Sequence, residues 1–145
     1  MVTNQELKDI HDLYHIPAKR QTVVIVMGSL GSSSVNRVMK EALRQMQYDD
    51  YDVIYVTGKK YYDEMKEELS DLNDSIHLVN YIDDIPSLIS SCDIIVSRAG
   101  ATTLAEITAL GAASLIIPSP YVVANHQEYN ARELVNAKAA RMILE

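Results

Sequence analysis

Short runs of β-branched and apolar residues alternate with longer amphipathic stretches along most of this chain. The runs at 22–26, 53–56, 76–79, 93–97 and 114–117 are typical of strands buried on both faces, and 141–144 follows as a sixth. The stretches at 35–46, 61–72, 86–91, 102–110 and 126–137 have the composition or periodicity of helices. In the first of them one apolar face is formed by Val35, Val38, Met39, Ala42, Leu43 and Met46. The alternation predicts a doubly wound, Rossmann-like α/β domain, with a parallel sheet of about six strands and helices on both faces.

Residues 1–20 precede this alternation and have a different pattern. Leu7, Ile10, Leu13 and Tyr14 form one apolar stripe, and Pro17 ends it. We therefore expect an appended helix and linker over residues 1–20, which packs on the sheet or on a missing neighbour. Residues 21–145 have a length typical of one domain.

Two helix boundaries are marked by their own residues. Asp83 or Asp84 is suited to cap the helix at 86–91, where Pro86 fits the first turn. Gly111 is suited to end the helix at 102–110, because glycine adopts the left-handed conformation common at that position.

The composition excludes several classes of protein. The chain has 20 acidic and 13 basic residues and a net charge of −7, which excludes a broad cationic groove for nucleic acid. No apolar run approaches ~18 residues and no signal-peptide pattern is present, so we expect a cytoplasmic protein without a spanning helix. The single cysteine, Cys92, excludes a disulfide framework and is expected to serve in packing. His11 and His15 lie four residues apart with no third ligand nearby, so no metal is expected.

The first candidate ligand loop follows the first strand. Ligands of doubly wound sheets bind outside the carboxyl ends of the strands. There the chain places Gly28, Ser29 and Gly31 just before a helix, where free N–H groups and a partial positive charge suit a phosphate or diphosphate. The glycine spacing matches neither a dinucleotide fingerprint nor a P-loop. A tight turn followed by a helix cap remains the alternative.

A second loop, after the fourth strand, runs into another helix. Arg98, Gly100, Ala101 and Thr103 open it, and Glu106 follows in the helix. The Glu106 carboxylate either accepts two hydrogen bonds from a ribose diol or complements the helix dipole. Arg98 either pairs with an anion or forms a surface ion pair.

Two further positions complete the candidate crevice. His126 and Gln127 stand at a helix start rich in polar groups, which suits hydroxyl-rich ligands, although a helix cap with a solvated first turn explains it too. The backbone of Tyr81 and Ile82, after the third strand, is placed to meet a planar base. Two phosphates, a ribose, a sugar and a base are the parts of a nucleotide sugar, so the loops together predict such a ligand.

These residues form a recognisable string. It comprises Gly28-Ser29-Leu30-Gly31, Asn36, Asp83-Asp84, Ser97-Arg98-Ala99-Gly100-Ala101, Glu106, Gly111, Pro118 and His126-Gln127 through Asn130. From residue 22 onward the chain resembles the C-terminal domain of the MurG transferases of glycosyltransferase family 28. Met27 stands where that family has glycine, and Ala99 where it often has serine. The resemblance implies the C-terminal half of a GT-B fold, which binds UDP-N-acetylglucosamine in an interdomain cleft without a metal or other cofactor.

The resemblance also implies roles for the candidate residues. Gly28, Ser29 and Gly31 would meet the diphosphate, and Tyr81 and Ile82 the uracil. Ala101 and Thr103, in the loop of Arg98 and Gly100, would lie at the phosphate and sugar. Glu106 would hold the ribose hydroxyls, and His126 and Gln127 the sugar hydroxyls.

The family transfers N-acetylglucosamine, with inversion, to lipid I and so forms lipid II in peptidoglycan synthesis. Its acceptor domain has no counterpart here. We therefore expect a donor-binding half with no catalytic residue of its own, inactive alone. Lipid I and the cytoplasmic face of the membrane would be reached only through the missing domain. One alternative is a single-domain catalytic subunit, like the eukaryotic Alg13, that needs a membrane partner. Another is a non-catalytic nucleotide-binding α/β module, although the missing acidic residue after the second strand disfavours NAD.

Overall fold

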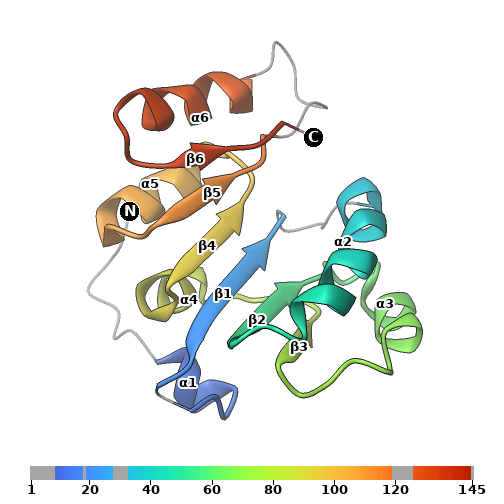
Figure 1. Cartoon of the computed structure of the whole chain (residues 1–145). Coiled ribbons are helices and arrows are strands. Elements are labelled where there is room, and N and C mark those ends of the chain that lie inside the picture. The colour runs from blue at the N-terminus through green and yellow to red at the C-terminus, as the bar shows by residue number, and fades with distance from the viewer. Residues whose placement is uncertain (1–8, 18, 28–32, 119–125, 145) are drawn as a thin grey trace.

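Six parallel strands form one sheet with helices on both of its faces (Figure 1). The computed structural model describes residues 9–17, 19–27, 33–118 and 126–144. The strands are β1 (Gln21–Val26), β2 (Tyr51–Val56), β3 (Ile76–Val79), β4 (Ile94–Ser97), β5 (Ser114–Ile116) and β6 (Arg141–Met142). The helices are α1 (Ile10–Leu13), α2 (Ser33–Met46), α3 (Tyr62–Glu68), α4 (Ile85–Ser91), α5 (Ala101–Leu110) and α6 (His126–Asn136). The doubly wound α/β fold predicted from the alternation is confirmed.

The strand order is β3-β2-β1-β4-β5-β6, so the chain reverses its direction of travel between β3 and β4. β1 pairs with β2 on one side and with β4 on the other, and Val26 lies opposite Ser97 at the carboxyl end of the β1–β4 pair. The helices that follow β1 and β4, α2 and α5, pack on opposite faces of the sheet. Such a divergence opens a crevice at the carboxyl ends of the strands, where doubly wound domains bind ligands.

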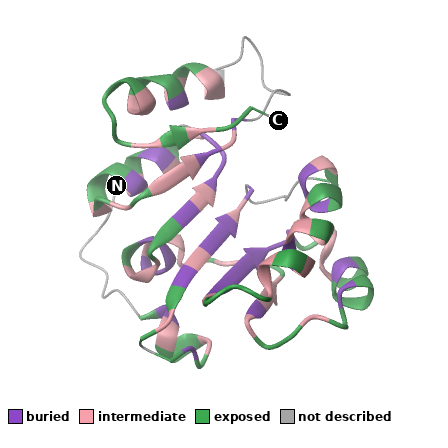
Figure 2. Ribbon diagram, in the orientation of Figure 1, coloured by how far each residue is buried: buried purple, intermediate pink, exposed green. Residues whose placement is uncertain are grey.

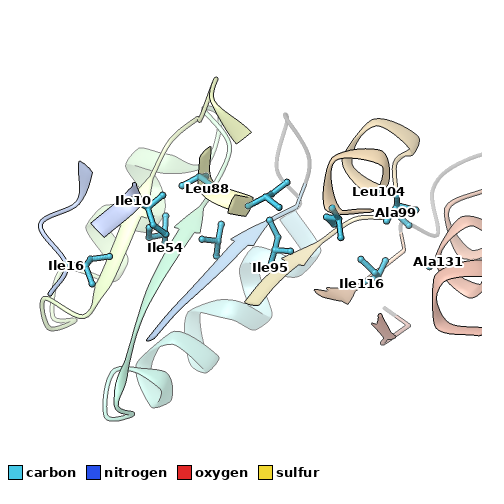
Figure 3. Packing of buried hydrophobic residues seen from close by; sticks show 12 residues of the cluster. Ile10, Ile16, Ile54, Leu88, Ile95, Ala99, Leu104, Ile116 and Ala131 are labelled. Atoms are coloured by element: carbon cyan, nitrogen blue, oxygen red, sulfur yellow. The ribbon is translucent and has the colours of Figure 1, made fainter. Parts of the chain in front are cut away.

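Two apolar clusters cover the two faces of the sheet. One packs α2 and α3 on residues such as Ile25, Val53 and Tyr55. The other joins α1, α4, α5 and α6 to the opposite face, and Figure 3 shows Ile54, Ile95 and Ile116 of three strands in it. Figure 2 shows the purple buried stretches concentrated in the central strands. Strands buried on both faces explain why the sequence runs are continuously apolar rather than alternating.

The predicted apolar face of α2 is wrong at one position. Val35 and Leu43 are buried, but Val38 is 67% exposed. Val38 lies at the edge of the stripe, because helical geometry turns it away from the direction that Val35 and Leu43 share.

The helix predicted over 61–72 is also shorter than expected, since α3 ends at Glu68. Beyond it, Asn73 donates from its backbone N–H to Gln47 Oε1 (3.0 Å) and from Nδ2 to the Gln47 carbonyl oxygen (2.9 Å). These bonds tie the chain to the end of α2 and so direct it away from the axis of α3.

The appended segment packs against α4, and its predicted stripe is partly correct. Ile10 and Ile16 are buried, and the Ile10 backbone N–H donates to Ser91 Oγ (3.1 Å) in α4. Leu13, however, is 48% exposed, because the helix has only four residues and its stripe ends before a full second turn. Leu7 lies outside the described residues.

The predicted boundary residues act as helix caps. The Asp84 carboxylate accepts hydrogen bonds from the backbone N–H of Ser87 (3.2 Å) and from Ser87 Oγ (2.7 Å), and Pro86 stands in the first turn. Gly111 ends α5 with a φ of 65°, in the left-handed region that favours glycine. Cys92 packs against the apolar cluster that joins α1, α4, α5 and α6 to the sheet, and burial raises the pKa of its thiol to about 12. Within the described ranges, no helix is long and apolar enough to span a membrane.

The α1 segment contains a titratable group, His11, with an oxygen partner at each ring nitrogen. His11 Nδ1 lies 2.8 Å from Asp9 Oδ1, and Nε2 lies 3.2 Å from the Arg20 carbonyl oxygen. Only the imidazolium donates from both nitrogens, and the hydrogen bond to Asp9, followed by that to Arg20, raises the pKa of His11.

We therefore predict that His11 stabilises the fold in a pH-dependent way. A raised folded-state pKa gives a contribution that is complete below the unfolded pKa and is lost as the pH rises through the folded pKa. The free energy of unfolding of the wild type, relative to that of His11→Gln, should fall as the pH rises above about 6.5, the usual pKa of histidine. Urea denaturation across this range measures it, and a constant difference would contradict the prediction.

Candidate functional site

The candidate ligand residues lie at the carboxyl edge of the sheet, in the loops and helix starts after β3, β4 and β5. Ile82 is half-buried beyond β3, whereas Tyr81 is exposed. Ala101 and His126 begin α5 and α6. Gly28, Ser29 and Gly31 lie outside the described residues, so the structure does not test the first loop. Of the remaining candidates, Arg98 and Gly100 precede α5, Ala101, Thr103 and Glu106 lie within it, and Gln127 bonds the Ala99 backbone just before it.

The start of α5 presents an open helix terminus. Gly100 is its cap residue, with φ −64° and ψ 145°, and as a glycine it supplies no side-chain hydrogen bond to the helix. This extended backbone is available to any residue, so conformation does not explain the glycine. A Cβ at this position would meet no atom of the described chain within 4 Å. The first-turn N–H groups of a helix have no partner within the helix. An anion therefore has room to approach these groups closely.

Thr103 lies in the first turn of α5, and Glu106 lies one turn further along the helix. They are three residues apart, so they share one face of α5, and both are half-buried. On the adjacent face of the helix Leu104 and Ile107 are buried in the core, which fixes the helix rotation. A hydroxyl near the helix start and a carboxylate one turn further on suit a phosphate followed by a diol.

Arg98 is buried beneath the loop that precedes α5. Its Nη1 donates to the carbonyl oxygens of Ile117 (3.2 Å) and Pro118 (3.1 Å), just beyond β5. The guanidinium thus fastens the end of β4 to the end of β5. The side chain is buried, so the surface position considered for this residue is wrong; its pairing with an anion stays a prediction.

A second buried polar group supports α2. The Tyr55 hydroxyl donates to Asn36 Oδ1, and Asn36 Nδ2 donates to the Thr57 carbonyl oxygen (3.4 Å). All three residues are nearly inaccessible. Burial raises the pKa of Tyr55, opposed in part by the charge of Arg98, so the phenol stays a neutral donor. The first turns of α2 are therefore anchored to β2, which positions the helix that follows the first candidate loop.

Two side chains of α6 hold the loop before α5. Gln127 Oε1 accepts from the Ala99 N–H (3.2 Å), and Asn130 Nδ2 donates to the Ala99 carbonyl oxygen (3.4 Å). Ala99 itself is fully buried. Asn130 entered the sequence analysis only through the resemblance, because a bond to backbone 31 residues away leaves no local signal.

Lys59 was missed by the sequence analysis. Gly58 takes a positive φ of 87° directly after β2. Beyond this turn, the Lys59 Nζ lies 4.6 Å from the centre of the Tyr81 ring. Gly58, in the turn after β2, is the sequence feature that could have indicated a functional loop at Lys59. Tyr81, the predicted neighbour of the base, therefore has a cation over its ring.

The structure also shows a groove at the opposite edge of the sheet, of about 890 Å³. Its buried carboxylate, Asp52, contacts Arg20 and lies 2.9 Å from His77 Nε2. Side chains of the protein itself thus compensate the negative charge of Asp52. No cluster of three metal-binding side chains occurs in the described part of the chain.

A sequence model described as the glycosyltransferase family 28 C-terminal domain matches residues 22–145. A relative in Listeria welshimeri is named UDP-N-acetylglucosamine--N-acetylmuramyl-(pentapeptide) pyrophosphoryl-undecaprenol N-acetylglucosamine transferase. It is 42% identical over 146 residues, which cover 99% of this chain and 40% of that protein. A relative of the same name in Limosilactobacillus fermentum is 47% identical over 126 residues, which cover 86% of this chain and 34% of its own length. The chain thus spans about two fifths or less of these curated relatives.

Solved structures show the same similarity. The crystal structure of Acinetobacter baumannii MurG superposes with a TM-score of 0.77 at 27% identity and covers 94% of this chain and 40% of that chain. The glycosyltransferase VinC, at 21% identity, has a TM-score of 0.71 over 92% of this chain and 31% of its own, and it shares the fold.

Replacing Arg98 tests its structural role. We predict that Arg98→Met lowers the free energy of unfolding by about 1–3 kcal/mol, because the carbonyl oxygens of Ile117 and Pro118 lose their charged donor. Arg132→Met is the matched control: Arg132 is exposed and pairs with Glu128 (2.7 Å) on the surface of α6, so its loss should cost at most about 1 kcal/mol. Urea denaturation measures both, and equal effects would contradict the assignment.

Proposed function

The chain belongs to glycosyltransferase family 28, whose C-terminal domain it matches from residue 22 onward, and we propose that it is the donor-binding half of an N-acetylglucosaminyltransferase. The open start of α5, with Thr103 and Glu106 on one face behind it, is the observation that carries this proposal. The relatives' printed names support UDP-N-acetylglucosamine as the donor and a pyrophosphoryl-undecaprenol acceptor. They favour this function over the Alg13-like subunit and the non-catalytic module.

The geometry suggests how the donor is held. The diphosphate lies at the N–H groups of the first turn of α5, and Glu106 accepts hydrogen bonds from the ribose hydroxyls. Ile82 reads the base through its backbone, with Tyr81 beside it. On the resemblance alone, we further propose that Gly28, Ser29 and Gly31 meet the diphosphate and that His126 and Gln127 bond the sugar hydroxyls.

The same contacts serve the chemistry of transfer. The acceptor hydroxyl attacks the anomeric carbon, the bond from this carbon to the β-phosphate oxygen breaks, and UDP leaves with the electron pair. Negative charge then grows on the diphosphate, where a preorganised helix terminus stabilises it. No metal or other cofactor takes part in this proposal. The base that removes the acceptor proton, and the contact with the cytoplasmic face of the membrane, are assigned to the part of the relatives that this chain does not match.

Donor binding is tested through Glu106. We predict that UDP and UDP-N-acetylglucosamine bind the chain, and that Glu106→Ala weakens both by roughly 10- to 100-fold, because charge-assisted hydrogen bonds to the ribose are lost. Glu133→Ala, at an exposed position of α6, is the control and should leave binding unchanged. Titration calorimetry measures the affinities. Binding of NAD in place of UDP would favour the non-catalytic module and contradict the proposal.

Transfer by the chain alone is a separate prediction. Incubated with UDP-N-acetylglucosamine and lipid I, the 145-residue chain should form no lipid II, because acceptor recognition is assigned elsewhere. Chromatography of radiolabelled lipid products measures this. Turnover would show that the chain holds its own acceptor site, even if donor binding stands.

A further inference from the structure

The loops after β2 and β3 meet at a cation that the proposed function leaves unused. Lys59 follows β2, and its Nζ lies 4.6 Å from the centre of the ring of Tyr81, which follows β3. We propose that Lys59 is a positioning residue for the base of the nucleoside diphosphate: it holds the Tyr81 ring in the orientation in which the ring covers the base. This inference rests on the proposed donor site, in which Tyr81 lies beside the base.

The sheet and a tight turn place Lys59 at this point. The ladder between β2 and β3 extends to the Thr57 N–H, which donates to the Val79 carbonyl oxygen (2.9 Å). Gly58 then takes a positive φ of 87°, and its carbonyl oxygen accepts from the Tyr61 N–H (3.2 Å), which closes a turn. Lys59 is the first residue inside this turn, so its side chain starts beside the carboxyl end of β3.

The backbone beneath Lys59 is fixed before any ligand binds. Thr57 is fully buried, and its Oγ1 donates to the Gly58 carbonyl oxygen (2.9 Å). The carbonyl oxygen of Thr57 accepts from Asn36 Nδ2 in α2 (3.4 Å). The turn is thus bonded both to β3 and to α2, and only the Lys59 side chain is left to choose a partner.

The Tyr81 ring is that partner. In the described part of the chain Lys59 has no carboxylate partner, unlike Lys40, whose Nζ pairs with Glu68 (2.5 Å). The face of an aromatic ring attracts a cation at the distance seen here. Tyr81 is still 36% exposed, so part of the ring is open to a ligand. A ring that is already ordered loses less conformational entropy when the base binds, which favours binding.

Removal of the charge should free the Tyr81 ring and weaken the donor. We expect Lys59→Gln to weaken UDP binding about two- to fivefold. Lys59→Arg should keep the wild-type affinity, because a guanidinium also binds the face of an aromatic ring. Lys60→Gln is the matched control and should leave the affinity unchanged. Lys60 is the next residue in the turn, equally exposed, and its Nζ lies over the Tyr61 ring instead (5.5 Å).

A double-mutant cycle distinguishes action through Tyr81 from direct contact with the diphosphate. Tyr81→Leu should itself weaken UDP. In that background Lys59→Gln should have no further effect, because the ring on which Lys59 acts is gone. Titration of the full 145-residue chain, followed by nuclear magnetic resonance, measures these affinities, including weak ones.

Three results would overturn the proposal. A loss on Lys59→Gln that persists in the Tyr81→Leu background would make Lys59 a ligand of the diphosphate. An equal loss in Lys60→Gln would show only a general effect of charge. Unchanged UDP affinity in either Lys59→Gln or Tyr81→Leu would remove the role of the pair in binding.

A second measurement needs no ligand. A ring face shields the protons above it, so the ε-methylene protons of Lys59 should resonate upfield of those of a lysine in an unstructured chain. Tyr81→Leu should abolish this shift, whereas Tyr61→Leu should not. Absence of the shift in the wild type would overturn the contact between Lys59 and Tyr81. The shift in a chain that binds no UDP would instead refute the proposed donor site and leave the contact in place.

Discussion

The parallel pairing of β1 with β4 is the constraint on which the rest of this structure depends. Its start is secured by Asp93, whose carboxylate accepts from the Thr22 N–H (2.7 Å) and whose N–H donates to the Thr22 carbonyl oxygen (2.9 Å). Its end brings Val26 beside Ser97. Because α2 and α5, the helices that follow these two strands, pack on opposite faces of the sheet, this register sets the topological switch point at which doubly wound domains bind ligands.

The polar groups buried under the crevice serve the backbone around it. Arg98 bonds carbonyl oxygens beyond β5, Asn36 ties α2 to β2, and Gln127 contacts Ala99. A helix terminus stabilises an anion only as well as its N–H groups are aimed, and these contacts set that aim. In a chain with a net charge of −7, the proposed donor site thus relies on oriented N–H dipoles.

The strands were predictable because burial on both faces requires continuous apolar runs, and the limits of 76–79 were correct to the residue. Helix limits were less predictable. α3 ends at Glu68, and the chain beyond it is directed away from the helix axis by two hydrogen bonds between Asn73 and Gln47. These bonds join parts of the chain that are distant in sequence. Val38 and Leu13 are exposed although both belong to predicted apolar stripes. A periodic stripe predicts which face of a helix is buried, but the packing of neighbouring elements decides which residues at the margin of that face are covered.

Sequence alone determined the order of the elements, the caps at Asp84 and Gly111, and the family to which the motif string belongs. These features depend on local periodicity, on single-residue backbone preferences and on residues in a fixed order. Only the tertiary structure decided the partners of Arg98, Gln127 and Asn130. Each bonds backbone atoms 19 to 31 residues away in the chain. The physical reason is that such a bond exists only after strand register and helix docking have brought the two segments together, and no local pattern encodes that distance.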